Sequence, residues 1–240
     1  MTNSLKLTTD YSDLYVLVDC NNFFVSCERV FDPVLQNRPT AVLSNNDGCI
    51  VARSNKVKAL GIPMGAPVFK WQHLIDEHHI QLRSANFSLY SDMSNRVINS
   101  LQEFCDDIEV YSIDEAFLRI PKHQNFIKQL WDMKYKIEQW TGIPISVGIA
   151  DTKTTAKLAN HIAKKYPEHQ GLFHLGREIP QTYGAISTDE IWGIGRANFK
   201  KLRLYHINTI DGFVGQRRTL IKQLIGIGGE RTWLELNNHR

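Results

Sequence analysis

Two adjacent carboxylates are the residues of this 240-residue chain whose types and spacing point most directly to chemistry. Asp114 and Glu115 lie between an alternating run at 108–111 and an apolar run at 116–118, which is the pattern of a β-hairpin corner. Neighbouring carboxylates repel each other, and their oxygens suit Mg²⁺, which takes one or two carboxylates together with substrate phosphates. An isolated Asp-Glu pair is more often a solvated acidic turn, so a metal site requires a further ligand.

A third carboxylate, Asp19, follows the compact apolar run 15–18, which predicts a buried strand. The other elements predicted for the body are a helix over 23–31, an amphipathic helix over 87–104, strands over 108–112 and 116–120, a second amphipathic helix over 126–140 and a strand over 145–149. Without the residues between 24 and 85, this order is β-α-β-β-α-β. It is the ferredoxin-like arrangement of a mixed α+β fold.

The ferredoxin-like order explains how three carboxylates that are distant in sequence could meet. In such a sheet the first and third strands are antiparallel central neighbours. The end of the first strand, with Asp19, therefore lies beside the start of the third, with Asp114 and Glu115. A cluster of this kind can hold two divalent ions about 3.5–4 Å apart, the spacing used for in-line phosphoryl displacement.

The residues from Pro33 to about Ala85 predict a small inserted subdomain, because they break into short pieces. The expected pieces are strands at 41–43 and 50–52, a turn at 45–48 between them, and a helix over about 54–60 that Gly61 stops.

Beyond the body, a helix is predicted over 152–165 and a strand over 172–175, with a change of character near Pro180. The helix carries Lys157, Lys164 and Lys165. The simpler interpretation is a solvated basic face, and the alternative places a lysine over a triphosphate. Spacing alone favours the first.

The segment after residue 190 predicts two short helices joined by an apolar-Gly-apolar-Gly turn, which is typical of a helix-hairpin-helix. Glycines at such a turn expose backbone N–H groups to a phosphate without reading bases. An ordinary tight corner between helices is the alternative, and the nearby basic residues favour phosphate contact. The candidate contacts are Gly193, Gly195, Arg196, Lys200 and Lys201. A second Gly-Ile-Gly at 226–228 is expected to form a turn.

The amino-acid composition indicates the general class of protein. With 42% hydrophobic and 22% charged residues, the chain is typical of a soluble globular protein. The sequence contains neither an apolar run long enough to span a membrane nor a leader. It therefore predicts neither a membrane span nor secretion, and a cytoplasmic location is expected. The four cysteines form no CxxC pair, which speaks against zinc.

The charge is unevenly distributed. Residues 191–240 carry nine Lys/Arg against three Asp/Glu, a net charge of +6, whereas residues 1–190 carry a net charge of −3. An acidic body with a basic tail region indicates one part that does chemistry and one that meets polyanions.

Several motifs in order carry a resemblance to a known family. Asp19–Glu28 (DCNNFFVSCE), Ser112–Phe117 (SIDEAF) and Ser146–Ile149 (SVGI) together resemble the Y-family, or translesion, DNA polymerases. Three further runs narrow the resemblance to the UmuC-type group, the catalytic subunits of bacterial DNA polymerase V: Ser44–Cys49, Asp92–Arg96 and Ala156–His161. The resemblance runs from about Tyr15 to Leu204.

The resemblance implies a polymerase hand. Its parts would be a palm over 1–23 and 86–178, fingers over 24–85 and an all-α helix-hairpin-helix thumb over 179–240. The activity implied is error-prone DNA synthesis of the translesion type, acting in SOS mutagenesis and the DNA damage response. Two Mg²⁺ ions, with Mn²⁺ as a substitute, would serve as cofactors. Their ligands would be Asp19, Asp114, Glu115 and the Cys20 carbonyl.

The same resemblance implies a nucleotide-binding set of Phe23, Phe24, Lys58 and Lys164. Phe24 stands where the family has its steric gate, an aromatic ring that excludes the ribose 2′-hydroxyl, and a core role applies better to Phe23. Lys58 and Lys164 match the positions that bind the triphosphate. The family often has tyrosine at the gate and arginine on the fingers, and a lysine supplies charge without a bidentate fork.

Primer–template DNA and a dNTP are the implied partners, together with UmuD′ and RecA. Family members continue into a little-finger domain that grips the duplex, whereas this sequence stops at Arg240, so the expectation is a weak grip on DNA. A DNA- or partner-binding fragment without catalysis is the main alternative. A nucleotide cyclase shares the palm and its two metals, but Phe24 and the Gly193–Gly195 hairpin speak against it.

Overall fold

The computed structural model describes residues 12–46 and 48–240 of the chain. Their contacts divide it into two compact units. Of the described residues, the first unit comprises 12–18, Phe117–Leu130 and Val147–Arg240, and the second comprises 19–46, 48–116 and Trp131–Ser146. Three of the four boundaries between these units fall inside strands of a single sheet, and the fourth falls inside the helix Phe126–Thr141.

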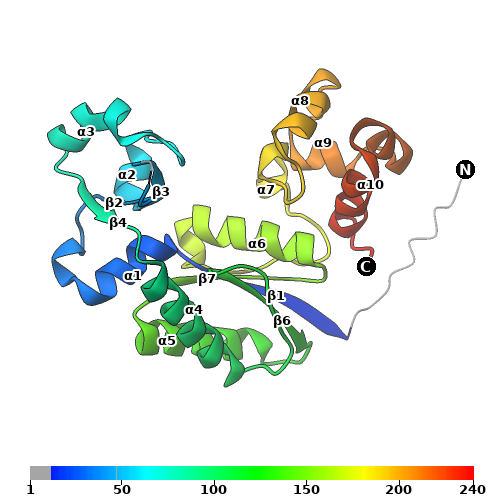
Figure 1. Ribbon diagram of the computed structural model, residues 1–240. Coiled ribbons are helices and arrows are strands. Elements are labelled where there is room, and N and C mark those ends of the chain that lie inside the picture. The colour runs from blue at the N-terminus through cyan, green and yellow to red at the C-terminus, as the bar shows by residue number, and fades with distance from the viewer. Residues whose placement is uncertain (1–11, 47) are drawn as a thin grey trace, which may run out of the picture. The chain divides into compact units, whose positions relative to one another are not determined.

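That sheet has five strands in the order β5-β6-β1-β7-β8 (Figure 1). They are β1 (Asp13–Cys20), β5 (Ile108–Val110), β6 (Glu115–Pro121), β7 (Ile145–Ala150) and β8 (Leu172–His174). The four strands predicted for the body are β1, β5, β6 and β7. Across the sheet they lie in the order β5-β6-β1-β7, which is the ferredoxin-like order. The predicted mixed fold is therefore confirmed. Strand β8 extends the sheet and is parallel to β7.

The central strands β1 and β7 form because they carry apolar runs, which in β7 only Ser146 interrupts. Leu14, Val16, Leu17 and Val18 of β1 are at most 2% exposed, and all six residues of β7 are buried. Continuous apolar runs are expected where both faces of a strand are covered. The helices predicted for the body are also present as α1 (Phe23–Phe31), α4 (Phe87–Gln102) and α5 (Phe126–Thr141).

The inserted subdomain lies in the second unit and has its own three-stranded sheet, in the order β3-β2-β4. Its elements are β2 (Thr40–Leu43), β3 (Ile50–Arg53), α2 (Asn55–Ala59), α3 (Gln72–Glu77) and β4 (Gln81–Ser84). The predicted β2, β3 and α2 are confirmed. No sequence pattern predicts α3 and β4, because both are too short to show a period. Strand β2 is antiparallel to β3 and parallel to β4.

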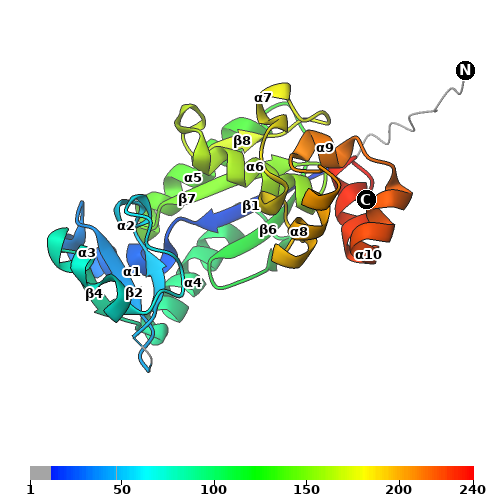
Figure 2. The ribbon, with the colours of Figure 1, turned by 90° about the horizontal axis from the view of Figure 1, so that it is seen from above.

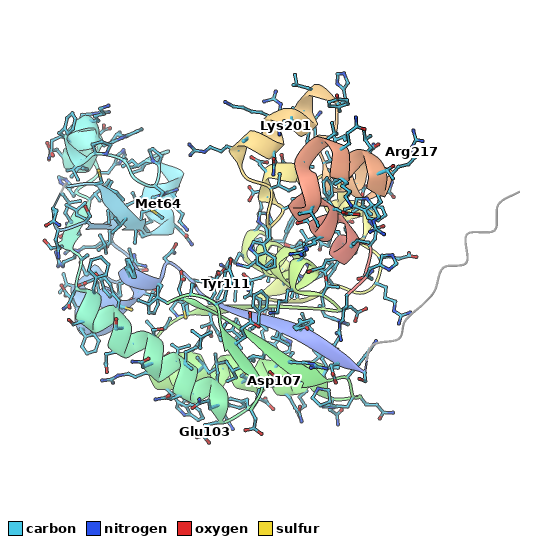
Figure 3. All side chains as sticks on the ribbon, turned by 45° about the vertical axis from the view of Figure 1, so that its right-hand side comes forward. Met64, Glu103, Asp107, Tyr111, Lys201 and Arg217 are labelled. Atoms are coloured by element: carbon cyan, nitrogen blue, oxygen red, sulfur yellow. The ribbon has the colours of Figure 1, made fainter. Side chains whose placement is uncertain are left out.

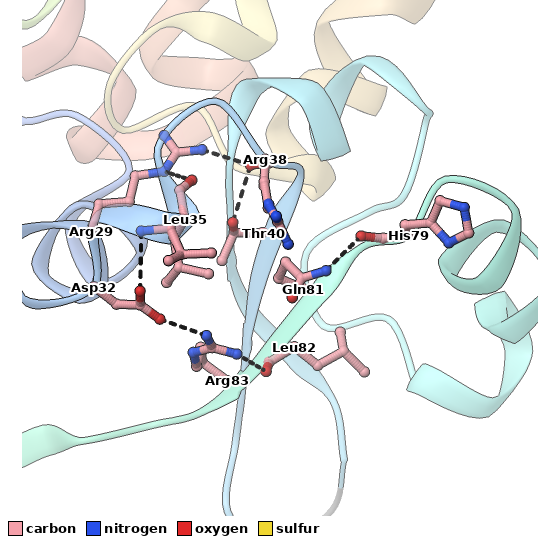
Figure 4. A network of polar contacts seen from close by, with 10 residues as sticks. Arg29, Asp32, Leu35, Arg38, Thr40, His79, Gln81, Leu82 and Arg83 are labelled. Carbon is pink, nitrogen blue, oxygen red and sulfur yellow. Dashed lines mark hydrogen bonds and ion pairs between the residues drawn. The ribbon is translucent and has the colours of Figure 1, made fainter.

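A polar network holds the two ends of the subdomain together (Figure 4). The Arg83 guanidinium donates to the Asp32 carboxylate at 2.8 Å, and Asp32 also accepts from the Val34 N–H at 3.1 Å. The bond from Arg83 holds the pKa of Asp32 below its ordinary value. Arg29 donates to the carbonyls of Leu35 and Arg38. The chain is therefore tied at its entry into the subdomain and at its return through β4.

In the first unit, α6 (Lys153–Lys165) packs against β8 and closes directly over β7 (Figure 2). The closeness depends on Gly148 in β7, because a Cβ there would lie 2.2 Å from the Asn160 nitrogen and 2.3 Å from the Ala156 oxygen. The start of α6 is capped by Thr152 and Thr155 in a capping box. The Glu235 carboxylate accepts from the Thr154 N–H at 2.8 Å.

The remaining helices of the first unit are α7 (Gln181–Gly184), α8 (Arg196–Leu204), α9 (Ile210–Val214) and α10 (Arg218–Leu236). Helix α10 is broken at Gly226, whose φ of 74° and ψ of −168° are not helical. Glu230 beyond the break is buried and pairs with Arg218 at 2.6 Å and Lys222 at 3.0 Å before it. These bonds lower the pKa of Glu230 and join the two halves of α10. In place of the turn expected at 226–228, the chain has a kink at Gly226 between the two helical halves of α10.

No helix in the described ranges combines the length and the apolar character that crossing a membrane requires.

The contact between α6 and β7 makes Gly148 a sensitive position. We expect Gly148→Ala to lower the free energy of unfolding by about 2–3 kcal/mol, because its methyl group would overlap main-chain atoms that cannot yield. Urea unfolding followed by circular dichroism measures the change. Gly228→Ala is the control, since a Cβ there meets nothing within 4 Å, and alanine favours helix. Equal urea midpoints for Gly148→Ala and the unmodified chain would contradict the close approach.

Candidate active site

The Asp-Glu pair lies at the corner of the β5–β6 hairpin, as the sequence predicts. The N–H groups of Tyr111 and Ser112 both donate to the Glu115 carbonyl at 3.0 Å, which closes the corner. Strand β5 ends at Val110 and β6 begins at Glu115, so the connection is longer than expected. Tyr111 is 46% exposed on this connection (Figure 3).

The end of β1 adjoins this corner. The Cys20 N–H donates to the Asp114 carbonyl at 2.8 Å. Asp19 is the residue before Cys20, so the main chain brings all three carboxylate-bearing positions to one edge of the sheet. The predicted neighbourhood of Asp19, Asp114 and Glu115 is confirmed at the level of the backbone, and all three belong to the second unit.

The Asp114 side chain has a partner within its own loop. Ser112 donates to the Asp114 carboxylate at 2.7 Å, which turns that carboxylate toward its own loop. Among the described residues, no three His, Cys, Asp or Glu side chains come close enough together to hold a metal ion. Like charges repel, and a divalent cation is what would offset the repulsion between these carboxylates.

The donor chemistry fits a magnesium site. Asp19, Asp114 and Glu115 are half-buried and supply only oxygen, which is the ligand set of hard cations. Cys20 would contribute its carbonyl oxygen rather than its sulfur. No softer side chain is needed in this set, so the residues suit Mg²⁺ or Mn²⁺ better than zinc.

Two asparagines that sequence reasoning missed fix the chain just after β1. Asn21 accepts from the Ser146 hydroxyl at 2.9 Å, and its N–H donates to the Pro144 carbonyl at 2.8 Å. Asn22 has a left-handed φ of 49° and donates to the Asn55 side chain at 3.0 Å. Asparagine adopts this conformation more readily than most residues, which was the available signal. The contact ties α2 to the start of α1.

Phe24 lies on the first turn of α1 in an aromatic group. Its ring stacks on Tyr90 with centroids 4.2 Å apart and an angle of 12°, and it meets the edge of Phe87 at 6.0 Å. Phe23 is 4% exposed, whereas Phe24 is only partly buried. Phe23 therefore fits the predicted core role better than Phe24 does.

Tyr90 supports Phe24 from a fully buried position in α4. Its hydroxyl donates to Glu28 at 2.7 Å, and burial raises the pKa of Tyr90 well above its ordinary value. Burial, with the charge of Glu28, also raises the pKa of the Cys27 thiol to about 12. Neither Tyr90 nor Glu28 was singled out in the sequence, because the partners are distant along the chain.

The two candidate lysines lie in different units. Lys58 is exposed on α2, three residues after Asn55, and it belongs to the second unit with the carboxylates. Lys164 is exposed near the end of α6 in the first unit.

The predicted helix-hairpin-helix is present in part. Gly193 has a φ of 89°, and Gly195 is the residue that precedes α8. The helix before the turn is only a short 3₁₀ segment, Thr188–Glu190, rather than the α-helix that the motif would have. The predicted contacts on α8 are exposed: Arg196, Lys200 and Lys201, the last labelled in Figure 3. Arg203, the fourth basic residue of this helix, is exposed as well.

Comparison with known proteins gives a family and relatives. Residues 18–161 match the IMS family, described as the impB/mucB/samB family. Protein ImpB of Salmonella typhimurium is 38% identical over 231 residues, and Protein UmuC of Salmonella typhimurium strain LT2 is 40% identical over 230 residues; each match covers 93% of this chain and 54% of the relative. DNA polymerase IV of Bacillus velezensis is 30% identical over 221 residues, which cover 89% of this chain and 52% of that protein.

Solved structures give the same fold. DinB from Sulfolobus solfataricus superposes with a TM-score of 0.79 at 25% identity, over 93% of this chain and 66% of that one. The insertion ternary complex of Dbh DNA polymerase has a TM-score of 0.78 at 25% identity, over 93% and 67%. The chain spans about half the length of the curated relatives that it matches. With its matching segment, its relatives and its polymerase fold, this chain belongs to the impB/mucB/samB family.

Proposed function

We propose that this chain is the catalytic core of a translesion DNA polymerase, which transfers a nucleotide from a dNTP to a primer 3′-hydroxyl. The observation that carries the proposal is the hydrogen bond from Cys20 to the Asp114 carbonyl. It aligns Asp19 with Asp114 and Glu115 at one edge of a palm-like sheet. Family membership supports the same activity.

The reaction follows from these residues. The primer 3′-hydroxyl loses its proton to solvent, and its oxygen forms a bond to the α-phosphorus while the bond from that phosphorus to pyrophosphate breaks in line. Asp19, Asp114, Glu115 and the Cys20 carbonyl would hold the metals. Two Mg²⁺ ions, or Mn²⁺ in their place, would lower the pKa of the attacking hydroxyl and neutralise charge on the phosphates. Lys58 would bind the triphosphate, and Phe24, with Phe23 beside it, would border the sugar. Lys164 stays a triphosphate contact proposed from the family resemblance alone.

DNA would be held by the basic part of the chain. The N–H groups after Gly195 stand at the start of α8, where a helix N-terminus favours a phosphate. Arg196, Lys200 and Lys201 would add a salt-dependent attraction. We keep the palm at 1–23 and 86–178, the fingers at 24–85 and the thumb at 179–240 as proposed parts.

The biological setting is proposed by the same family likeness. A polymerase of this type would work in the cytoplasm, where the DNA is, and would join the SOS response with UmuD′ and RecA as partners. Co-purification of each partner with the chain tests this directly.

A binding fragment without catalysis is the second candidate. The observation in its favour is the exposed basic face of α8, which would bind a polyanion without any catalysis. The two candidates differ in one outcome, which is extension of a primer.

We expect the chain to extend a primer on an undamaged template with Mg²⁺ and dNTPs. Asp19→Asn, Asp114→Asn and Glu115→Gln should each reduce the rate by about 100-fold or more, because each removes a charge that would hold a metal in the reacting geometry. The measurement is single-turnover extension resolved on a gel.

Glu103→Gln and Asp107→Asn serve as matched controls, since both carboxylates are exposed beyond the end of α4 (Figure 3). Both should extend at the unmodified rate. If the folded chain binds primer–template but adds no nucleotide with either Mg²⁺ or Mn²⁺, the polymerase proposal is wrong and the binding fragment remains.

Phe24 carries a second prediction. Removing its ring should open the space beside C2′ of the sugar, so Phe24→Ala should raise incorporation of ribonucleotides relative to deoxyribonucleotides by about tenfold or more. The ratio of kcat/KM for rATP and dATP measures the change. Phe31→Ala is the control, because Phe31 lies on the same helix and is 58% exposed. A ratio that does not change in Phe24→Ala would remove Phe24 from the nucleotide site.

A further inference from the structure

In the loop that precedes α8, the side chain of Trp192 packs against two other elements of the first unit. Its ring lies 5.3 Å from the Lys157 ammonium of α6 and 6.0 Å from the ring of Phe117 in β6. The same ammonium lies 6.0 Å from the Phe117 ring. The three groups therefore contact one another pairwise, and all belong to the first unit.

The main chain of the same loop is held from another side. Thr232 of α10 donates its hydroxyl to the Trp192 carbonyl at 3.4 Å. Gly193, the next residue, has a left-handed φ, and a Cβ on it would lie 2.8 Å from the Thr232 oxygen. The ring of Trp192 is thus fixed by α6 and β6, while its carbonyl is fixed by α10. Together these contacts hold both the side chain and the main chain of Trp192.

We propose that Lys157 and Phe117 are positioning residues that clamp Trp192 and so hold the Gly193–Gly195 loop in the form that presents the first N–H groups of α8 to a DNA phosphate. The proposal rests on the proposed function, because it assumes that this loop meets DNA. It assigns the charge of Lys157 to two aromatic faces, where a cation is attracted by the ring quadrupole. Lys157 would then support DNA binding without touching DNA.

The competing account gives Lys157 a direct role. As a lysine on an amphipathic helix, it could contact a phosphate itself, with Trp192 as ordinary packing. The two accounts predict different couplings. A phosphate contact acts alone and contributes to the dependence on salt. A clamp acts only through Trp192, so the effects of changing the two residues cannot add.

The first experiment tests the clamp without DNA. The full chain is labelled with 5-fluorotryptophan, and the Trp192 signal is assigned as the one missing from Trp192→Phe. Lys157→Met keeps most of the stem but removes the charge, and it should shift and broaden that signal, while Lys157→Arg should keep it near its original position. Lys165→Met, an exposed change on the same helix, should leave it unmoved. A sharp, unshifted signal in Lys157→Met would overturn the clamp.

The second experiment measures affinity for a fluorescein-labelled primer–template duplex by anisotropy at several salt concentrations. Lys157→Met and Trp192→Leu should each weaken binding by about tenfold, which is the size of one partly desolvated cation–π contact. The double variant should lose no more affinity than the single variant with the larger loss. In all three variants, the slope of log affinity against log salt should equal that of the unmodified chain. Trp192→Phe and Lys157→Arg should restore most of the affinity.

Other outcomes decide against the proposal in distinct ways. If the losses multiply in the double variant and Lys157→Met reduces the salt slope by about one, Lys157 contacts a phosphate and is not a positioning residue. Unchanged affinity in both single variants would also overturn the proposal. If the unmodified chain binds no duplex, the proposed function fails, and with it the role in DNA binding. The fluorine signal would still decide whether the clamp exists.

Discussion

The hydrogen bond between the Cys20 N–H and the Asp114 carbonyl joins β1 to the corner of the β5–β6 hairpin. Strand β1 is buried almost throughout, and burial specifies register strongly, because a slip of one residue turns every side chain to the opposite face. Such a slip would carry Asp19 away from Asp114 and Glu115. The candidate site therefore depends on the apolar packing of β1 as much as on its carboxylates.

At the hairpin corner, main-chain hydrogen bonds fix the positions of Asp114 and Glu115, while their side chains can still change orientation. The Glu115 carbonyl accepts two N–H groups from the connection, and the Asp114 carboxylate is held by Ser112. Sites built on strands are held more precisely than sites on loops. Here the strand ends fix the main-chain positions of the three acidic residues. A cation bound between their carboxylates would set the orientation of the side chains.

The basic region after residue 190 presents less free charge than its composition indicates. Arg218 and Lys222 pair with the buried Glu230 across the break in α10. Arg240 donates to the Asp151 carbonyl at 2.7 Å and lies 4.9 Å from the Tyr15 ring. These cations hold the fold together, since an unpaired buried Glu230 would be costly. The exposed charge that remains for a polyanion is concentrated on α8.

The sequence by itself determined the ferredoxin-like strand order, the hairpin corner at Asp114 and Glu115, and the meeting of that corner with Asp19. These follow from apolar runs, alternation and connection rules that act locally. Strand β4, the stack of Tyr90 on Phe24 and the two asparagines after β1 were decided only by the tertiary structure. Each joins residues that are distant along the chain, and no local pattern records such a pairing. The same holds for Lys157, whose spacing predicts only a solvated face. Its neighbours Phe117 and Trp192 come from other elements, and only the folded chain brings their rings to its charge.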